Sequence, residues 1–218
     1  MSSGRVGSTK ADKPGKPESA TNIVAFDFDG TLTVRDSFLS FLTWRAGPVG
    51  WIWGGFALAP ALGRYLLERD RARMKAAAVR QFLRGAPASD LRAWARTFAE
   101  THSATLLRPD ALRTWSEWRA EGATLVIVTA SPDILVAPFA EHLGADHLLG
   151  TRLALDENDR ITGELAGENC RGPEKRRRLE EIFGPDVRLT AAYGDTAGDA
   201  DMLAIADHAG YREFQARP

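Results

Sequence analysis

Two carboxylates stand two residues apart, at Asp27 and Asp29, directly after the apolar run 23–26. In an extended segment, side chains two apart lie on the same face, so these negative charges repel each other unless a positive group lies between them. Magnesium and a phosphoryl group suit such a place, because Mg²⁺ binds one or two carboxylates together with phosphate oxygens. A turn, Gly30-Thr31, follows at once. The run therefore predicts phosphoryl chemistry at the end of a strand.

Three later segments bring further polar groups to the end of an apolar run or the start of a helix. They are Thr129 after 125–128, Lys175 after 172–174, and Asp195 and Asp199 after 189–194. In this order, together with the Asp-x-Asp-Gly-Thr run, they resemble the four motifs of the haloacid dehalogenase-like (HAD) phosphohydrolases. The resemblance covers residues 22–218 and is weaker between the first two motifs.

The resemblance implies hydrolysis of a phosphomonoester through an aspartyl-phosphate. Asp27 would be the nucleophile, and Asp29 would first protonate the leaving group and then activate water. Mg²⁺ would be held by Asp27, the backbone carbonyl of Asp29 and Asp195. Thr129 and Lys175 would bind the transferring oxygens and stabilise their charge.

The resemblance also implies supporting roles for other residues, and some of the site residues have a purely structural alternative. Asp199 would hydrogen-bond a metal-bound water or orient Lys175, or else it caps the last helix. Ser131 would add a phosphate contact, while Gly30 and Thr31 form the turn. Lys175 opens a basic run and could instead lie on a solvated helix face. An Asp-x-Asp-Gly turn alone also occurs in polar connections and calcium loops.

Two other functions use similar residues. A phosphotransferase would pass the phosphoryl group to an alcohol instead of water. A receiver-like phosphorylation switch, which is not an enzyme, also carries an acidic pair, a hydroxyl and a lysine on a parallel sheet. Receivers are about half this length and carry the phosphorylated Asp on a middle strand. Here the candidate nucleophile ends the first strand, which disfavours that alternative.

The pattern of elements predicts an α/β fold with a doubly wound, mainly parallel sheet. We expect strands over 22–27, 124–129, 148–155, 161–165, 188–193 and 209–213, and helices from about 37 and over 89–107, 110–121, 133–143, 173–183 and 199–206. In such sheets the site lies outside the carboxyl ends of the strands, where all four motifs fall. That convergence makes one pocket out of residues far apart in the sequence.

The chain divides into three parts. Residues 1–20 hold no apolar run and read as a disordered tail. Residues 21–36 and 109–218 form the core domain, and residues 37–108 form an inserted, mostly helical cap. A cap at this place resembles subfamily IB of the HAD superfamily, which includes phosphoserine phosphatases.

Composition bounds the function further. The 218 residues carry a net charge of −1, so nothing global points to nucleic acid as a partner. The single cysteine, Cys170, forms no disulfide within the chain and is expected to be a small packed side chain. The first twenty residues lack the apolar core of a secretory signal. These features favour a cytoplasmic location, and the oligomeric state has no signal in the sequence.

The cap begins with an unusual apolar segment. Residues 46–63 carry no charge. As a helix the segment would be ~27 Å long, just short of the ~30 Å hydrocarbon core. A lone span would separate Asp27 from Asp195, so two interpretations remain: the inner face of a soluble cap, or a hairpin in the membrane interface. The basic residues that follow would meet anionic headgroups or form a solvated helix face; they are Arg64, Arg69, Arg71, Arg73 and Lys75.

The cap also bears on the substrate. It resembles the cap of phosphatidylglycerophosphatase C-type hydrolases, in which an apolar stretch follows the first motif. This favours a lipid-linked or hydrophobic phosphomonoester such as phosphatidylglycerophosphate. Asp36 stands nine residues after Asp27, where phosphoserine phosphatases place an acidic substrate contact, although it could instead cap the helix that starts near 37. A small substrate of the phosphoserine type is therefore the alternative.

Overall fold

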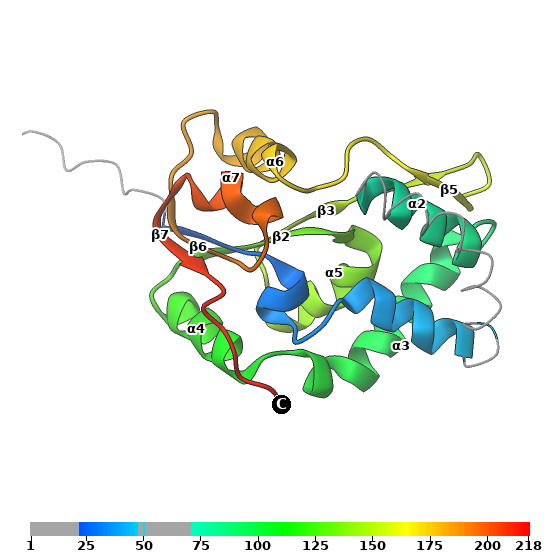
Figure 1. The fold of residues 1–218 in the computed structure, drawn as a ribbon, viewed down its shortest axis with the longest axis horizontal. Coiled ribbons are helices and arrows are strands. Elements are labelled where there is room, and N and C mark those ends of the chain that lie inside the picture. The colour runs from blue at the N-terminus through cyan, green and yellow to red at the C-terminus, as the bar shows by residue number, and fades with distance from the viewer. Residues whose placement is uncertain (1–21, 48–49, 51–70) are drawn as a thin grey trace, which may run out of the picture.

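The computed structural model describes residues 22–47, 50 and 71–218. Its main sheet is parallel, with the strand order β3-β2-β1-β6-β7 (Figure 1). The strands are β1 (Ile23–Phe26), β2 (Thr124–Pro132), β3 (His147–Thr151), β6 (Leu189–Gly194) and β7 (Ala206–Tyr211). The order places β1 between β2 and β6, with later strands added outward on both sides. This confirms the predicted doubly wound parallel sheet.

Helices cover both faces of the sheet, because alternate residues of each strand point to opposite faces. Val24 and Phe26 pack into a cluster on one face, and Ile23 and Ala25 pack into a separate cluster on the other. The first face is covered by α4 (Pro109–Ala120) and α5 (Asp133–Leu143), and the second by α6 (Pro173–Phe183) and α7 (Ala200–Leu203). The central strands β2, β1 and β6 are largely buried on both sides, which explains their nearly continuous apolar runs, whereas the edge strand β7 is mostly exposed.

The strand predicted over 148–155 is wrong in one respect, because the structure divides it. Residues 147–151 pair with β2 in the main sheet, whereas β4 (Leu153–Leu155) pairs antiparallel with β5 (Ile161–Leu165). A turn joins β4 to β5, and in it the Asp156 carboxylate accepts hydrogen bonds from the amides of Asn158 and Arg160. Only Thr151 and Arg152 separate the apolar residues of the two halves, so the sequence does not show that each half pairs with a different partner.

The last helix and strand also differ from the prediction. The helix expected over 199–206 spans only Ala200–Leu203, after a short 3-10 turn at Ala197–Asp199. The strand expected from 209 begins at Ala206, which pairs with Leu189 of β6. Pairing with β6 satisfies backbone groups that would otherwise continue the helix, so tertiary pairing overrides the local helical pattern.

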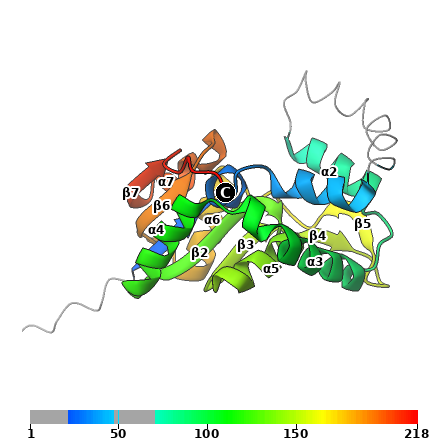
Figure 2. The ribbon, with the colours of Figure 1, turned by 90° about the horizontal axis from the view of Figure 1, so that it is seen from below.

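A further group of elements lies beside the carboxyl ends of the main strands (Figures 1 and 2). It comprises the helical residues 37–47, α2 (Arg71–Phe82), α3 (Ala88–Leu106) and the β4–β5 pair. Phe41, Val79 and Phe98 from this group belong to the same apolar cluster as Phe28 and Phe139. The two parts are therefore joined by continuous packing.

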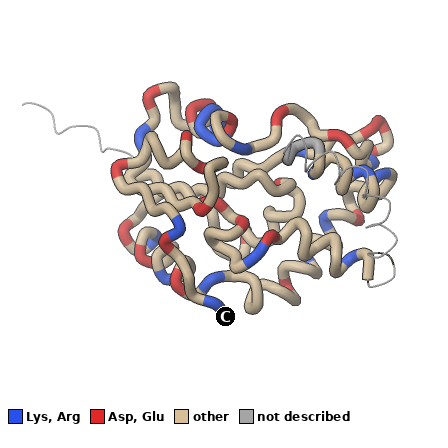
Figure 3. Tube along the Cα trace, viewed as in Figure 1, with Lys and Arg blue, Asp and Glu red and all other residues tan. Residues whose placement is uncertain are grey.

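The predicted tail and most of the apolar segment 46–63 lie outside the described residues. Within the described ranges, no helix combines the length and the apolar character that a membrane span requires. Basic and acidic residues are interspersed over the visible trace in Figure 3, as the small net charge suggests.

Candidate active site

The site lies where β1, β2 and β6 end side by side. Asp27 follows β1 directly, and its amide donates to the Tyr193 carbonyl of β6 at 2.8 Å. Thr129 and Ser131 lie in the last part of β2, and Asp195 follows β6. Adjacent parallel strands thus bring these residues to one edge of the sheet, as the spacing predicts.

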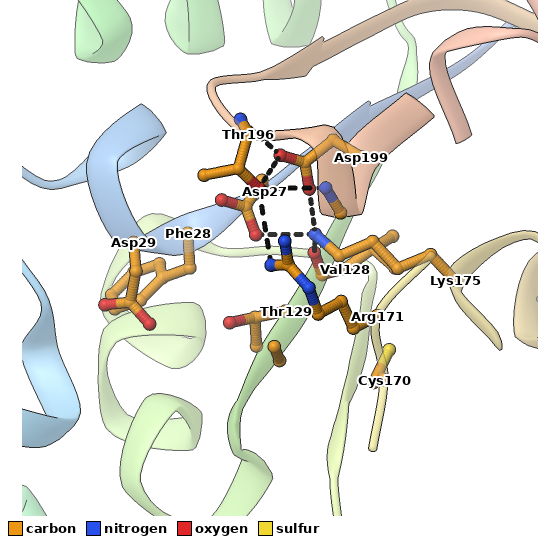
Figure 4. Close-up of polar contacts among 12 residues, drawn as sticks. Asp27, Phe28, Asp29, Val128, Thr129, Cys170, Arg171, Lys175, Thr196 and Asp199 are labelled. Atoms are coloured by element: carbon orange, nitrogen blue, oxygen red, sulfur yellow. Dashed lines mark hydrogen bonds and ion pairs between the residues drawn. The ribbon is translucent and has the colours of Figure 1, made fainter. Parts of the chain in front are cut away.

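Lys175 occupies the centre of the site, although it lies on α6. Its side chain is 1% exposed, and its ammonium donates to Asp27 Oδ1, Asp199 Oδ1 and the Val128 carbonyl, each at 2.6 Å. An ammonium has three hydrogens, so all of them are used by the protein itself. Figure 4 shows the three contacts converging on the lysine. Lys175 therefore lies in the site and not on a solvated helix face.

Burial and ion pairing shift the pKa values of Asp27, Asp199 and Lys175 in different directions. Burial raises the pKa of Asp27 to about 7, against the lowering effect of Lys175. Burial also opposes ionisation of Asp199, but the attraction and hydrogen bond of Lys175 lower its pKa below the ordinary value. Burial alone would lower the pKa of Lys175, yet the two carboxylates raise it. Lys175 and Asp199 are thus held as a charged pair beside a carboxyl group that titrates near neutrality.

Two of the acidic residues fit a divalent cation. Ligand atoms of Asp27, Asp195 and Asp199 lie within 4.8 Å of one another. Asp195 Oδ1 is buried without a hydrogen-bond partner among the described residues. Both oxygens of Asp199 are already engaged, one by Lys175 and the other by Thr196. A cation bound by Asp27 and Asp195 would satisfy the orphaned oxygen, since such groups are costly when buried unpaired.

The turn after β1 is shaped around Asp195. Gly30 has a φ of +87°, a left-handed conformation that glycine adopts readily. A Cβ at this position would overlap the Asp195 carboxylate. The neighbouring Thr31 is buried, and its hydroxyl has no partner among the described residues. Gly30 therefore permits the close approach of the first and last motifs.

Asp29 points away from the Lys175 centre (Figure 4). Its Oδ1 accepts the Ser37 amide at 2.7 Å, and its Oδ2 accepts the Ser131 hydroxyl. The Ser131 hydroxyl is thus already used within the protein. Thr129 is fully buried, and its Oγ1 accepts the Ser131 amide at 3.0 Å. These bonds fix the Asp29 carboxylate between the end of β2 and the start of the helical residues 37–47.

Asp36 caps a helix, as one of its two predicted roles requires, and it also lines the cavity. Its Oδ1 accepts the Leu39 amide at 2.7 Å, which caps the helical residues 37–47. It also lines the cavity that contains Asp27 and Asp29. Desolvation and the nearby charge of Asp29 raise the pKa of Asp36. Asp36 therefore caps the helical residues 37–47 and lines the cavity at the same time.

The cavity has a volume of about 620 Å³, and every site residue predicted from the sequence lines it except Thr31. The part of its wall that comes from the helical residues 37–47 and α2 is mostly apolar: Phe38, Leu39, Leu42, Met74, Ala78 and Phe82. The cavity therefore combines a charged part at the sheet with a mostly apolar part from these helices.

Two basic residues of the cavity were not predicted as site residues. Lys75 of α2 donates to the Ala130 carbonyl at the end of β2, and burial lowers its pKa. Lys75 therefore lines the cavity and does not lie on a solvated helix face. Arg171 lies four residues before Lys175, and its guanidinium reaches Thr196. Neither residue belongs to a motif that marks it as part of a site, so only the tertiary structure identifies them.

Cys170, which directly precedes Arg171, is buried, and its thiol donates to the Leu149 carbonyl of β3 at 3.5 Å. Burial raises the pKa of its thiol to about 11, which keeps the thiol protonated at neutral pH. The expectation of a packed, unreactive cysteine agrees with this environment.

Comparisons with known proteins agree with this geometry. The family model for haloacid dehalogenase-like hydrolases matches residues 24–204. Protein CicA of Caulobacter vibrioides is 61% identical over 196 residues, which cover 90% of this chain and 88% of that protein. A probable phosphatase of Mycobacterium tuberculosis is 35% identical over 91 residues, or 40% of this chain and 31% of that protein.

Solved structures share the fold. A protein with unknown function from Bordetella pertussis Tohama I has a TM-score of 0.66 and 21% identity, over 85% of this chain and 87% of that one. A phospho-aspartyl intermediate analogue of phosphoserine phosphatase has a TM-score of 0.59 and 22% identity, over 88% and 86%. At 21% and 22% identity, these structures show that the fold is shared.

Proposed function

We propose that this chain, which belongs to the haloacid dehalogenase-like hydrolases, is a phosphatase that hydrolyses phosphomonoesters through an aspartyl-phosphate on Asp27. The observation that carries this proposal is the buried Lys175, which joins Asp27 to Asp199 beside the orphaned oxygen of Asp195. A structural ion pair alone would not need an unpaired carboxylate oxygen next to it.

The first step uses Asp27 as the nucleophile. One of its oxygens attacks phosphorus while the bond to the leaving oxygen breaks. Lys175 holds Oδ1 of Asp27, which leaves Oδ2 for the attack. The positive charge of Lys175 and the hydroxyl of Thr129 stabilise the negative charge on the transferring oxygens.

The proton passes through Asp29. It protonates the leaving oxygen in the first step. It then takes a proton from the water that attacks the aspartyl-phosphate, which releases inorganic phosphate and restores the Asp27 carboxylate. The Ser37 amide and the Ser131 hydroxyl orient Asp29 for this role. Under this proposal, Ser131 acts through Asp29.

Asp27, Asp195 and the backbone carbonyl of Asp29 would hold Mg²⁺. When bound, Mg²⁺ supplies positive charge that offsets the phosphoryl oxygens and lets two carboxylates and a phosphate share one place. Asp199 is excluded from this set because Lys175 and Thr196 occupy its oxygens.

We propose an amphiphilic phosphomonoester as the substrate, such as a lipid-linked phosphate of the phosphatidylglycerophosphate type. The mostly apolar wall formed by the helical residues 37–47 and α2 supports this, because it lines the same cavity as the charged residues. We take residues 37–108 as the cap that supplies this wall, with residues 46–63 at the inner face of the membrane. A small substrate of the phosphoserine type is the alternative, favoured by the acidic Asp36 in the same wall.

The test is magnesium-dependent phosphate release by the wild type and by Asp27→Asn. The panel holds phosphatidylglycerophosphate, lysophosphatidate, phosphoserine and 4-nitrophenyl phosphate. We expect the lipid phosphates to turn over fastest and Asp27→Asn to lose at least about a thousandfold of the rate. Asp207→Asn, an exposed carboxylate paired with Arg188, is the control. Turnover of phosphoserine alone would contradict the lipid substrate, and an active Asp27→Asn would contradict the mechanism. Transfer to added glycerol would identify a phosphotransferase.

A further inference from the structure

Three cations face the cavity: Lys75, Arg171 and Lys175. Their hydrogen bonds differ. Lys175 gives all three hydrogens to protein acceptors. Lys75 donates to the Ala130 carbonyl, and the charges of Asp29 and Asp36 act on it. Lys175 therefore has no hydrogen left for a phosphoryl group beside Asp27, and Lys75 is held at the end of β2 near the charges of Asp29 and Asp36.

Arg171 differs from both lysines. Its side chain makes a single hydrogen bond with the described residues, from Nη1 to the Thr196 hydroxyl at 3.5 Å. No carboxylate among the described residues pairs with it. A guanidinium carries five N–H donors in a planar fork that matches two oxygens of a phosphate. Four of these donors are therefore free at the edge of the site.

The backbone around Arg171 is built to hold it there. The amide of Gly172 donates to the Gly198 carbonyl at 2.7 Å, which ties this loop to the loop after β6. The Gly198 backbone does not have a positive φ, so its conformation does not demand glycine. A Cβ on Gly198 would instead overlap the Arg171 guanidinium. Because Gly198 has no side chain, the Arg171 guanidinium can occupy this space, where it is directed toward Asp27, Thr196 and Lys175 (Figure 4).

From these contacts we propose that Arg171 is a phosphate-binding residue of the proposed phosphatase: its free guanidinium donors bind the non-bridging oxygens of the phosphoryl group next to Asp27. Lys175 supplies charge from behind Asp27, and Arg171 supplies the hydrogen bonds that Lys175 cannot. This inference rests on the proposed function, because it needs a phosphate beside Asp27. It also predicts that Arg171 binds the inorganic phosphate product.

The test measures binding of inorganic phosphate by calorimetry in the presence of MgCl₂. The variants are Arg171→Gln, Arg171→Lys and the control Arg176→Gln, an exposed arginine of the same region paired with Glu180. Hydrogen bonds to charged groups contribute enough for Arg171→Gln to weaken phosphate binding by about 10- to 100-fold. Arg171→Lys should recover part of the loss, and Arg176→Gln should bind as the wild type does.

Gly198→Ala gives a second route, because its methyl group would displace the guanidinium while Arg171 stays in the chain. It should weaken phosphate binding as Arg171→Gln does, and the double variant should bind no more weakly than either. For 4-nitrophenyl phosphate, whose leaving group has no second anion, kcat/KM should fall by a similar factor in Arg171→Gln.

Phosphate binding by Arg171→Gln within twofold of the wild type would overturn the proposal. So would a wild type that binds no phosphate, or a loss confined to substrates with a second anionic group. Asp27→Asn tests the proposed function through turnover, whereas Arg171→Gln is tested through binding. The two claims can therefore fail separately.

Discussion

At the residue scale, the site depends on one buried cation shared by two carboxylates. Lys175 could be predicted because it follows the glycine and proline that start α6, in a motif of known order. Its three contacts could not, since they join residues 24 to 148 positions apart. Lys75 and Arg171 were missed for the same reason. A basic residue outside a motif has no local feature that separates a cavity wall from a solvated surface.

The raised pKa of Asp27 predicts a pH dependence of stability. Its folded pKa of about 7 exceeds the ordinary 3.8, so between these values the folded protein binds more protons than the unfolded chain. The free energy of unfolding of the metal-free protein should therefore fall as pH rises from about 4 to 7. Asp195 has a raised pKa as well and adds to the fall.

Urea denaturation from pH 4.5 to 8 in EDTA measures this effect. Asp27→Asn should show a smaller fall than the wild type over the same range. Asp207→Asn, which removes an exposed carboxylate, should follow the wild type. Parallel curves for Asp27→Asn and the wild type would contradict the buried, uncharged Asp27.

At the scale of elements, the periodicity of the sequence predicted the sheet and the helices of the core well. The places where it failed are those where pairing decides the outcome. The division at Arg152 follows from which partner each half finds, β2 or β5. The early start of β7 follows from its pairing with β6. Local pattern cannot report a partner, so neither boundary was predictable.

The turn after β1 predicts the effect of Gly30→Ala. Alanine would be strained at a φ of +87°, and its methyl group would overlap Asp195. We expect a loss of about 1 kcal/mol in the free energy of unfolding and at least a tenfold loss of Mg²⁺ affinity. Gly122→Ala is the matched control, because its φ is +73° with nothing within 4 Å of the new Cβ.

Calorimetric titration with Mg²⁺ and urea denaturation separate the two effects. Both variants should lose similar stability from backbone strain. Only Gly30→Ala should lose Mg²⁺ affinity. Equal Mg²⁺ affinity in the two variants would show that the approach of Gly30 to Asp195 does not shape a metal site.

At the scale of the whole molecule, the charged end of the cavity comes from the sheet and the apolar wall from the elements beside it. The apolar cap segment that the sequence analysis singled out, 46–63, lies mostly outside the described residues, and the cap boundaries at 37 and 108 stay a prediction. Packing does not separate the cap from the core, because α3 and the helical residues 37–47 contribute to the same apolar cluster as the helix α5.

That continuous cluster, which joins Phe41, Val79 and Phe98 to Phe28 and Phe139, has a consequence for heat denaturation. Two parts that share one interior cannot melt independently, so scanning calorimetry should show a single transition whose calorimetric and van't Hoff enthalpies agree. Phe98→Ala should lower the free energy of unfolding by about 3–5 kcal/mol without splitting the transition. Two resolved transitions would contradict this. Enzyme activity and the folded structure should therefore be lost at the same temperature.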